Sequence, residues 1–244
     1  MLTKTNGIVL RATKYGDTSL IVTIFTQASG IQAYIQKGIR GSGAKQNKAA
    51  FFQPGMLLDL VVYRNPQKQL QVIRDYQATH IYSTVQESMV KNSVLIFSVE
   101  LLLRLLPEGA PIPFLFDFAS EYFITLDKIE VSKVANFPLY FIINCSRILG
   151  YEVQGTYSEE TPFLNMQEGS YTDHSPASIP FTTDEDARQL NILLGINDYP
   201  TLAQIEMNSP MRLRLLDWFI SFLQCHTQHM GKIKSLVILQ TILH

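Results

Sequence analysis

The spacing of the hydrophobic residues changes near residue 80, and this change constrains the fold more than any other feature of the sequence. Before it, short runs rich in β-branched and aromatic residues alternate with turn signals, as in residues 18–26 and 30–37, which is typical of strands. After it, apolar residues recur every three to four positions, as in residues 85–106, which is typical of helices. We therefore expect an α+β chain with a β-rich domain over residues 1–80 and a helical domain over residues 81–244.

The first eighty residues contain five strand-like runs, which cover residues 7–10, 18–26, 30–37, 56–63 and 69–74. Turn sequences separate several of them, for example Tyr15-Gly-Asp17 and Asn65-Pro-Gln-Lys68. Five short strands in this length predict a small closed barrel of the OB type. Within the third run, Ile31, Ala33 and Ile35 alternate with polar residues, and we place Tyr34 on the polar face.

The second part predicts helices over residues 85–106, 114–126, 133–149, 209–230 and 233–243. Prolines at positions 107, 111 and 113 end the first of these. Glycine and proline residues scattered between Glu152 and Pro180 predict an irregular insertion at about residues 151–182. The longest apolar stretch, residues 94–106, contains Glu100 and Arg104, so it is too short and too charged to span a bilayer.

A net charge of −1 conceals a strong asymmetry between the two parts of the chain. Residues 1–80 hold ten Lys and Arg residues against three Asp residues, a net charge of +7. Residues 81–244 hold ten basic and eighteen acidic residues, a net charge of −8. Chance variation between domains is the alternative explanation. We favour an interaction between the first part and a polyanion, since the charge changes where the hydrophobic spacing changes.

Single-stranded nucleic acid is the polyanion that best suits a basic barrel with aromatic side chains. Residues 38–48 contain three glycines, three basic residues and no acid, and we interpret them as a flexible basic loop rather than a plain connection. Tyr34 is a candidate for stacking on a base, or else packs against a neighbouring strand. The predicted DNA-binding residues are Arg11, Lys14, Tyr34, Lys37, Arg40, Lys45, Lys48, Arg64, Lys68 and Arg74.

A second basic surface is predicted near the C-terminus. Arg212, Arg214, Lys232 and Lys234 lie in sequence near Trp218 and other apolar residues of an otherwise acidic region. A basic rim around an apolar groove suits an acidic peptide with an apolar end, so these four residues are the predicted partner-binding residues. The alternative is an amphipathic helix that packs on the core.

Few residues suggest catalysis or metal binding. The sequence has no phosphate-binding glycine loop, nucleophile elbow or zincin motif. Cys225 and His229 are four residues apart, and Cys145 or His174 could complete a metal site with them, but the sequence has no second ligand pair. The alternative is a buried cysteine and two partly exposed histidines, His226 and His229, near a helix end. Two cysteines in apolar contexts suggest a reducing compartment, and the N-terminus lacks the apolar segment of a secretory signal. We expect a cytoplasmic, nucleoid-associated protein that is not an enzyme.

Three groups of residues carry a resemblance to a known family. The first is Thr5-Asn-Gly-Ile-Val-Leu10 with Tyr15-Gly-Asp17, Phe25-Thr26, Gly30 and Lys37-Gly-Ile-Arg40. The second is Phe137-Pro-Leu-Tyr140 with Leu149-Gly-Tyr151, and the third is Lys232-Ile-Lys-Ser235 before an apolar helix. Together they resemble the bacterial RecO family of recombination mediators, and their order covers nearly the whole chain.

The resemblance implies a DNA repair protein that binds single- and double-stranded DNA and anneals complementary strands. It also implies two kinds of protein partner, the acidic C-terminal tail of single-stranded DNA-binding protein and a RecR-type mediator, and a role in loading the recombinase. Lys232, Lys234 and Ser235 match the family pattern near the C-terminus, whereas Arg212 and Arg214 are not placed by it. No nucleotide hydrolysis is implied.

The chain departs from the family in one respect. Many members carry a four-cysteine zinc module after the Leu-Gly-Tyr signature, but no cysteine lies between Tyr151 and Pro180 here. We therefore expect no zinc and no other cofactor. Two alternative functions remain open from the residues alone: an RNA-binding accessory factor, because such barrels also bind RNA, and a metal-dependent nuclease that uses His174, His226 and His229.

Overall fold

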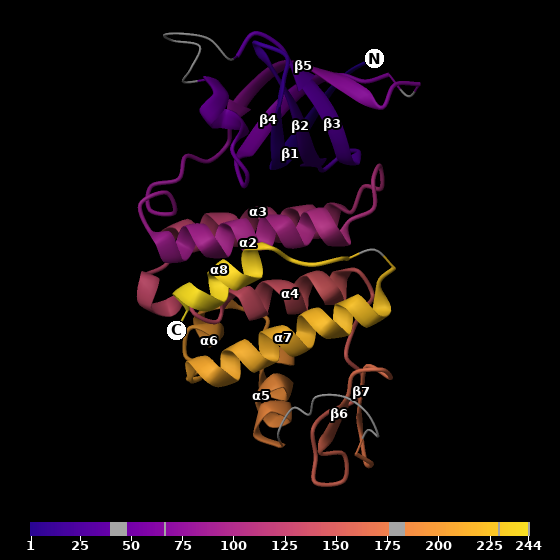
Figure 1. Ribbon diagram of the computed structural model, residues 1–244, viewed down its shortest axis with the longest axis vertical. Coiled ribbons are helices and arrows are strands. Elements are labelled where there is room, and N and C mark those ends of the chain that lie inside the picture. The colour runs from indigo at the N-terminus through magenta and orange to yellow at the C-terminus, as the bar shows by residue number, and fades with distance from the viewer. Residues whose placement is uncertain (40–47, 66, 176–183, 229, 244) are drawn as a thin grey trace. The chain divides into compact units, whose positions relative to one another are not determined.

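The computed structural model describes residues 1–39, 48–65, 67–175, 184–228 and 230–243 (Figure 1). The chain divides into two compact units. The barrel unit comprises residues 1–87 and 105–128, and the helical unit comprises residues 88–104 and 129–244. The expected fold class, a five-stranded OB-type barrel followed by helices, is confirmed. The domain boundary expected near residue 80 stays a prediction.

Five strands form a closed barrel in the order β1-β2-β3-β5-β4. The strands are β1 (Leu2–Tyr15), β2 (Ser19–Thr26), β3 (Gly30–Gln36), β4 (Leu57–Tyr63) and β5 (Leu70–Ala78). Neighbouring strands are antiparallel except for β3 and β5, which are parallel over a short stretch. The strands expected over residues 18–26, 30–37, 56–63 and 69–74 are confirmed, with small shifts at their ends.

The first strand closes the barrel because it pairs with two neighbours. Its first half, Leu2–Ile8, pairs with β4, and its second half, Gly7–Tyr15, pairs with β2. Gly7 takes part in both ladders. A Cβ atom at Gly7 would lie 2.6 Å from Ile24 Cγ2 and 2.8 Å from Leu60 Cδ1, so a larger residue here requires these core side chains to move.

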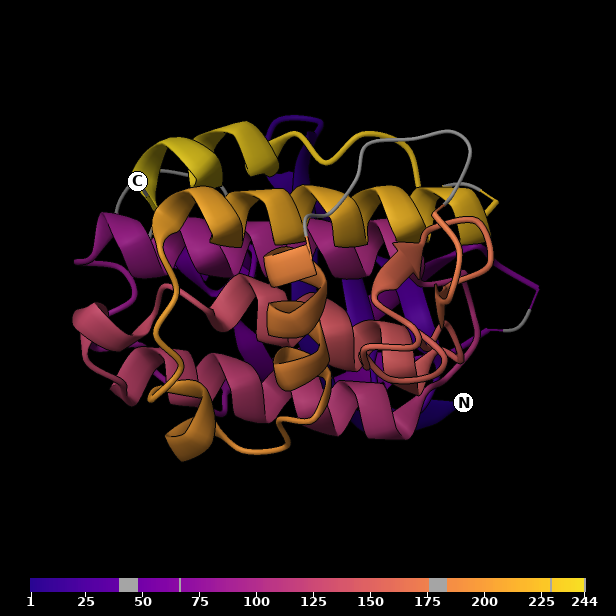
Figure 2. The ribbon, with the colours of Figure 1, turned by 90° about the horizontal axis from the view of Figure 1, so that it is seen from below.

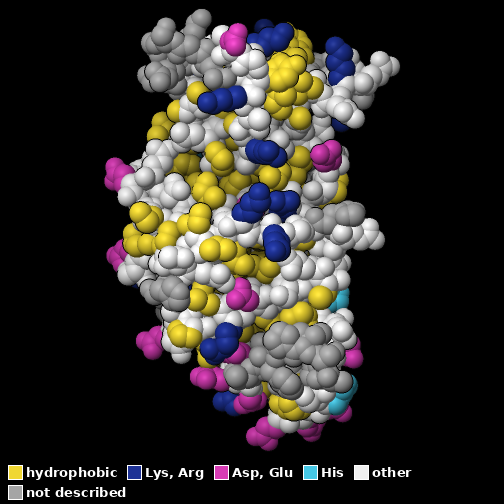
Figure 3. Space-filling view, in the orientation of Figure 1, with side chains coloured by type: hydrophobic (Ala, Val, Ile, Leu, Met, Phe, Trp, Pro, Cys, Tyr) yellow, Lys and Arg dark blue, Asp and Glu magenta, His cyan; other side chains and the backbone are white. Residues whose placement is uncertain are grey.

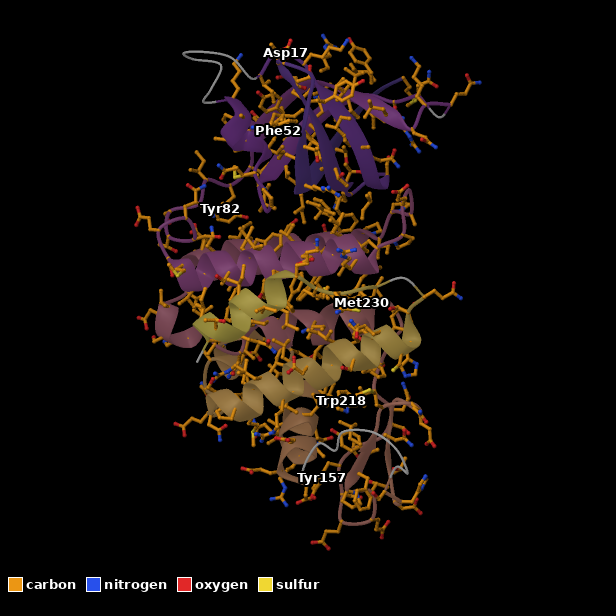
Figure 4. All side chains as sticks on the ribbon, in the orientation of Figure 1. Asp17, Phe52, Tyr82, Tyr157, Trp218 and Met230 are labelled. Atoms are coloured by element: carbon orange, nitrogen blue, oxygen red, sulfur yellow. The ribbon has the colours of Figure 1, made fainter. Side chains whose placement is uncertain are left out.

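The barrel interior is filled by side chains from every strand and by one short helix. Ile8, Val22 and Leu60 are fully buried in it. The 3₁₀ helix η1 (Ala49–Phe52) adds Phe52, which is 1% exposed and points toward the strands (Figure 4). The α-helix α3 (Pro113–Lys128) belongs to the same unit and packs on the barrel through an edge-to-face contact between Phe116 and Phe25, with ring centroids 5.5 Å apart.

The helical unit contains most of the remaining elements. These are α2 (Met89–Leu105), η2 (Val131–Lys133), α4 (Phe137–Ile148), β6 (Phe163–Asn165), β7 (Ser170–Thr172), α5 (Asp184–Leu194), α6 (Tyr199–Leu202), α7 (Ser209–His226) and α8 (Ser235–Ile242). Up to residue 175, the irregular insertion expected after residue 150 contains the short β6–β7 hairpin.

Helix α4 lies at the centre of this unit. Phe137 and Phe141 share one face of the helix and Leu139 lies on the opposite face, yet all three are fully buried. Helix α7 runs along α4 (Figure 2) and contributes Trp218 (Figure 4). The ring of Trp218 stacks on that of Phe222, with ring centroids 5.5 Å apart. Within the described residues, no helix combines the length and the apolar character that crossing a membrane requires.

Candidate nucleic-acid interface

The outer face of β2 and β3 borders a pocket of about 470 Å³, called here the outer-face pocket. Its lining residues come from β2, β3, the β4–β5 loop and the segment before α3: Thr23, Ile31, Gln32, Ala33, Gln67, Lys68, Gln69, Glu108 and Gly109. OB barrels bind nucleic acids on the face of their second and third strands and in the loop between the fourth and fifth. The pocket therefore lies where this architecture favours a bound strand.

Two predicted cations belong to this face. Lys68 lines the pocket directly. Arg11 on β1 pairs with Thr23 on β2, which pairs in turn with Ala33 on β3, so these three residues form one row across the sheet. Adjacent strands are about 4.8 Å apart, which places Arg11 within roughly 10 Å of the pocket. Lys14 follows three residues further along β1, opposite Leu20.

Three other predicted cations meet at a second pocket, which we call the Tyr76 pocket. Its volume is about 420 Å³, and it is lined by Gln36, Lys37, Gly38, Ile39, Lys48, Phe51, Arg74, Asp75 and Tyr76. The structure thus brings together Lys37, Lys48 and Arg74, which come from three separate parts of the sequence. None of these three residues lines the outer-face pocket, and the two pockets share no lining residue, so the predicted DNA-binding residues at the pockets form two groups.

The basic side chains of the barrel are available to an external ligand. Arg11, Lys14, Lys37, Lys48, Arg64, Lys68 and Arg74 are all exposed, and none of them forms an ion pair with a carboxylate in the part of the chain that the structure describes. Figure 3 shows such basic side chains on the barrel surface. Arg40 and Lys45, with most of the loop predicted over residues 38–48, lie outside the described residues.

The predicted role of Tyr34 is wrong. Its side chain is 2% exposed, so it cannot stack on a base. The reason is the register: Tyr34 pairs with Val22, which is fully buried, and directly opposed residues share a face of the sheet. Tyr34 therefore points into the barrel, where burial raises the pKa of its hydroxyl. Tyr15 and Tyr63 are the half-exposed tyrosines of the barrel strands.

The predicted partner-binding role of Arg212 is also wrong. Its side chain is buried, its Nε donates to Asn136 Oδ1 at 2.9 Å and its Nη2 donates to the carbonyl oxygen of Met207 at 2.7 Å. Burial lowers the pKa of the guanidinium group. Arg212 therefore anchors the first turn of α7 to the loops beside it. No sequence pattern distinguishes such an arginine from an exposed one.

Arg214 is held by a carboxylate. Its Nε and Nη2 donate to the two oxygens of Asp186 at 2.8 and 2.7 Å, and this hydrogen bonding raises the pKa of Arg214. Asp186 is fully buried, so the pair links α7 to α5 and neutralises the buried charge. About half of the Arg214 side chain remains exposed, and its role in partner binding stays a prediction.

Lys232 and Lys234 are exposed in the segment before α8. The Glu100 carboxylate accepts hydrogen bonds from the backbone N–H groups of Lys234 and Ser235 at 3.0 and 2.8 Å, and Arg104 Nη2 lies 3.8 Å from the same carboxylate. Arg104 and the segment that carries the two lysines therefore contact the same carboxylate, which places these three cations near one another.

We call Arg104, Lys232 and Lys234 the C-terminal basic patch. The exposed apolar residues Val237 and Ile238 follow it on α8. Arg104 was not among the predicted partner-binding residues, because it lies on α2, far from the two lysines along the chain.

Nothing in the described residues favours a metal. They contain no group of three or more His, Cys, Asp or Glu side chains placed to hold an ion. Cys145 is buried, His226 Nε2 donates to the carbonyl oxygen of Met166 at 3.0 Å, and His174 contacts Asp173. His229 lies outside the described residues.

The β6–β7 hairpin does not fit the zinc module that the family resemblance implies. Residues 151–180 contain no cysteine, and the described part of the hairpin is held by hydrogen bonds. Gln154 bonds through its backbone to Gly169 and Tyr171, and the Tyr171 hydroxyl donates to the carbonyl oxygen of Ala187 at 2.9 Å.

Comparisons with known proteins point to one family along nearly the whole chain. The family model described as "Recombination protein O N terminal" matches residues 1–82, and the one described as "Recombination protein O C terminal" matches residues 86–236. Relatives named DNA repair protein RecO include one from Christiangramia forsetii, 28% identical over 242 residues, and one from Phocaeicola vulgatus, 29% identical over 242 residues. In both cases the match covers 99% of this chain and 99% of the relative.

Proposed function

Because the chain belongs to the recombination protein O family of DNA repair proteins, we propose that it acts as a recombination mediator. In this role it binds single- and double-stranded DNA, anneals complementary strands and helps load a recombinase onto DNA coated by single-stranded DNA-binding protein. The observation that carries the proposal is the match to both family models along nearly all of the sequence. Such a protein works on chromosomal DNA, so we expect it at the nucleoid.

The barrel supplies the proposed DNA contacts. Lys68 lines the outer-face pocket, and Arg11 lies beside it on β1, opposite Thr23. Both side chains are exposed, and neither forms an ion pair with a carboxylate among the described residues. Lysine and arginine side chains bind backbone phosphates and displace counterions, which makes affinity depend steeply on salt. Phosphate contacts carry no sequence information, and a protein that must act on any strand needs none.

The helical unit supplies the proposed partner contacts. The C-terminal basic patch stands beside Val237 and Ile238, which are 68% and 59% exposed. Cations beside apolar side chains suit a peptide that is acidic and ends in apolar residues, which is the chemistry of the single-stranded DNA-binding protein tail. We also propose a RecR-type mediator as a second protein partner.

The proposed role requires no catalysis. The charged residues of the outer-face pocket are Lys68 and Glu108, and this pair does not form a nucleophile-and-base arrangement. We therefore propose that the protein acts by binding and juxtaposing strands. The energy for annealing comes from base pairing itself.

Annealing of complementary strands coated with single-stranded DNA-binding protein tests the proposal. The strands are coated either with the intact protein or with a form that lacks its C-terminal tail. We expect faster annealing on strands coated with the intact protein, because the tail recruits the mediator to them. A matched RNA competitor is included in a separate reaction.

Two results would count against the mediator role. Annealing at the same rate with and without the tail would contradict the proposed contact with the single-stranded DNA-binding protein tail. Stronger competition by RNA than by DNA of the same sequence would favour an RNA-binding accessory factor.

A further inference from the structure

The Tyr76 pocket is not explained by the usual binding face of an OB barrel. Strands β3 and β5 pair in parallel only from Ala33–Leu70 to Ile35–Val72. Beyond these pairs β5 continues along β4, while β3 ends at Gln36, so the two strands separate. The pocket begins at that point, at Gln36 on one side and Arg74 on the other. It is a gap between two strands rather than part of the outer face.

The walls of the pocket include two aromatic rings that the fold holds in place. The ring of Tyr76 packs edge-to-face on the buried ring of Phe52, with centroids 4.7 Å apart. Phe51 contacts Tyr76 in the same manner at 5.6 Å. Phe51 and Tyr76 are themselves only partly buried and line the pocket. Rings fixed in this way lose little conformational freedom when a flat ligand packs on them.

Positive charge surrounds these rings. Lys37, Lys48 and Arg74 line the pocket and are exposed, against the carboxylate of Asp75. The Asp75 carboxylate accepts a hydrogen bond from the backbone N–H of Tyr76 at 2.9 Å. Three cations around partly exposed aromatic rings suit a ligand that is both anionic and aromatic.

Gln36 contributes a polar side chain whose hydrogen-bond acceptor has no donor in the described part of the chain. Its Oε1 is the buried side-chain oxygen that has no hydrogen-bond partner among the described residues. A buried acceptor without a partner destabilises the protein, so a ligand that donates an N–H to this amide recovers that free energy. Every nucleobase carries at least one N–H group in its unpaired form.

We propose that the Tyr76 pocket holds one unpaired nucleotide of a single strand. The base packs against Phe51 and Tyr76 and donates to the Gln36 amide, and the flanking phosphates contact Lys37, Lys48 and Arg74. A duplex base does not enter, because it is stacked and paired inside the helix. This inference rests on the proposed DNA-binding function and adds a site that prefers single strands.

Phe51→Leu and Gln36→Met test this site with three probes. The probes are a single-stranded oligonucleotide, a strand of the same length and charge built of abasic residues, and the corresponding duplex. We expect Phe51→Leu to weaken binding of the normal single strand roughly tenfold, since base stacking on an aromatic side chain has about this effect. Binding of the abasic strand and of the duplex changes by less than about twofold.

Gln36→Met provides a second test that does not depend on the aromatic wall. The substitution keeps the length of the side chain and removes the unpartnered oxygen. We expect about fivefold weaker binding of the single strand, because the base no longer has this hydrogen-bond acceptor, and an unchanged or higher Tm. A purely structural role for Gln36 predicts a lower Tm instead. Phe114→Leu, which alters an 82% exposed ring outside the pocket, is the matched control.

The outcomes separate this site from DNA binding in general. If both variants bind every probe as the wild type does, while Arg11→Glu with Lys68→Glu loses affinity, the pocket proposal is overturned and the DNA-binding function stands. Equal weakening of all three probes by Phe51→Leu also overturns it, since no base is then recognised. If the wild type binds no probe at low salt, both proposals fall.

Discussion

At the scale of single residues, Asp127 is the side chain of the barrel unit with the most hydrogen bonds among the described residues. Its carboxylate accepts hydrogen bonds from the backbone N–H groups of Ser83, Thr84 and Val85, from the hydroxyls of Ser83 and Thr84, and from His80 Nε2. The side chain is 2% exposed. The residues that follow β5 are therefore fixed to the last turn of α3 by one carboxylate.

We expect Asp127→Ala to destabilise the protein by about 3 kcal/mol, because several donors lose their acceptor and buried donors are costly to leave unpaired. Urea unfolding followed by circular dichroism measures this difference. Asp117→Ala serves as the control, since Asp117 is exposed and its Oδ1 accepts a single hydrogen bond from Gln27. Equal stability of the two variants would contradict the role of Asp127.

The same carboxylate predicts a dependence of stability on pH. Burial alone raises the pKa of Asp127, but the hydrogen bonds from Thr84, Ser83, Val85 and His80 outweigh it and hold the pKa far below the ordinary value of 3.8. A lowered pKa in the folded state stabilises the fold above the unfolded pKa, and this contribution disappears as the pH falls. We expect the wild type to lose stability between about pH 5 and pH 2 more steeply than Asp127→Asn, measured by urea unfolding at each pH. Parallel pH profiles would refute this.

Sequence patterns predict only part of what the structure shows at single residues. Alternation in residues 31–36 correctly indicates a strand, but a period of two does not say which face is inside. The pattern places Tyr34 outside because Ile31 and Ile35 look like core residues, whereas its partner Val22 on β2 decides the question. The hydrogen bonds of Asp127 and Arg212 depend on residues far away in sequence, so no local pattern indicates them.

At the scale of elements, the N-terminus of helix α8 is capped by Glu100, a side chain from α2. Burial raises the pKa of Glu100, but hydrogen bonds from Ser235 and Lys234 outweigh it and lower that pKa. The Ser235 hydroxyl donates to Glu100 Oε2 at 2.6 Å in addition to the two backbone donors. The Lys232-Ile-Lys-Ser235 sequence thus leads into helix α8, and two of its backbone N–H groups, those of Lys234 and Ser235, are capped by a carboxylate from another helix.

We expect Glu100→Ala to destabilise the protein by about 1–2 kcal/mol, which is typical for loss of a helix cap, and to loosen α8 most. Hydrogen exchange followed by mass spectrometry should show that the variant exchanges faster than the wild type, and that this increase is larger in residues 235–242 than in α4. Glu121→Ala is the control, because Glu121 is exposed on α3. Unchanged protection of α8 would show that Glu100 is not needed to hold it.

The β6–β7 hairpin allows a prediction on metal removal. Because hydrogen bonds from Gln154 and Tyr171 hold it and no thiolate is present in residues 151–180, a chelator has nothing to remove there. We expect 1,10-phenanthroline to leave Tm unchanged. A fall in Tm with release of zinc would show that the hairpin or another part of the chain binds the metal.

Sequence patterns predict most elements but not their full extent. The pattern predicts strand β1 over residues 7–10, whereas the strand covers Leu2–Tyr15, because its two ends are exposed and carry polar residues. Their strand conformation comes from pairing with β4 and β2, a long-range effect. The grouping of Lys37, Lys48 and Arg74 also follows from barrel closure and is invisible in sequence.

At the scale of the whole molecule, the charge asymmetry predicts two separable activities. Arg11→Glu with Lys68→Glu alters the barrel, and Lys232→Glu with Lys234→Glu alters the C-terminal basic patch. Both pairs change the net charge by the same amount, so each is the control for the other. We expect the barrel pair to weaken DNA binding at least about tenfold and to leave binding of the single-stranded DNA-binding protein tail within about twofold.

The C-terminal pair should show the reverse pattern, because a peptide with an acidic stretch loses its cations while the barrel keeps its own. Fluorescence anisotropy with a labelled oligonucleotide and with a labelled tail peptide measures both affinities at several salt concentrations. The slope of log affinity against log salt for single-stranded DNA should become shallower by about 0.7 for each phosphate that the barrel pair no longer neutralises. If both pairs of substitutions weaken the binding of both ligands equally, net charge alone determines binding. The proposal that the barrel unit binds DNA and the helical unit binds the tail peptide is then wrong.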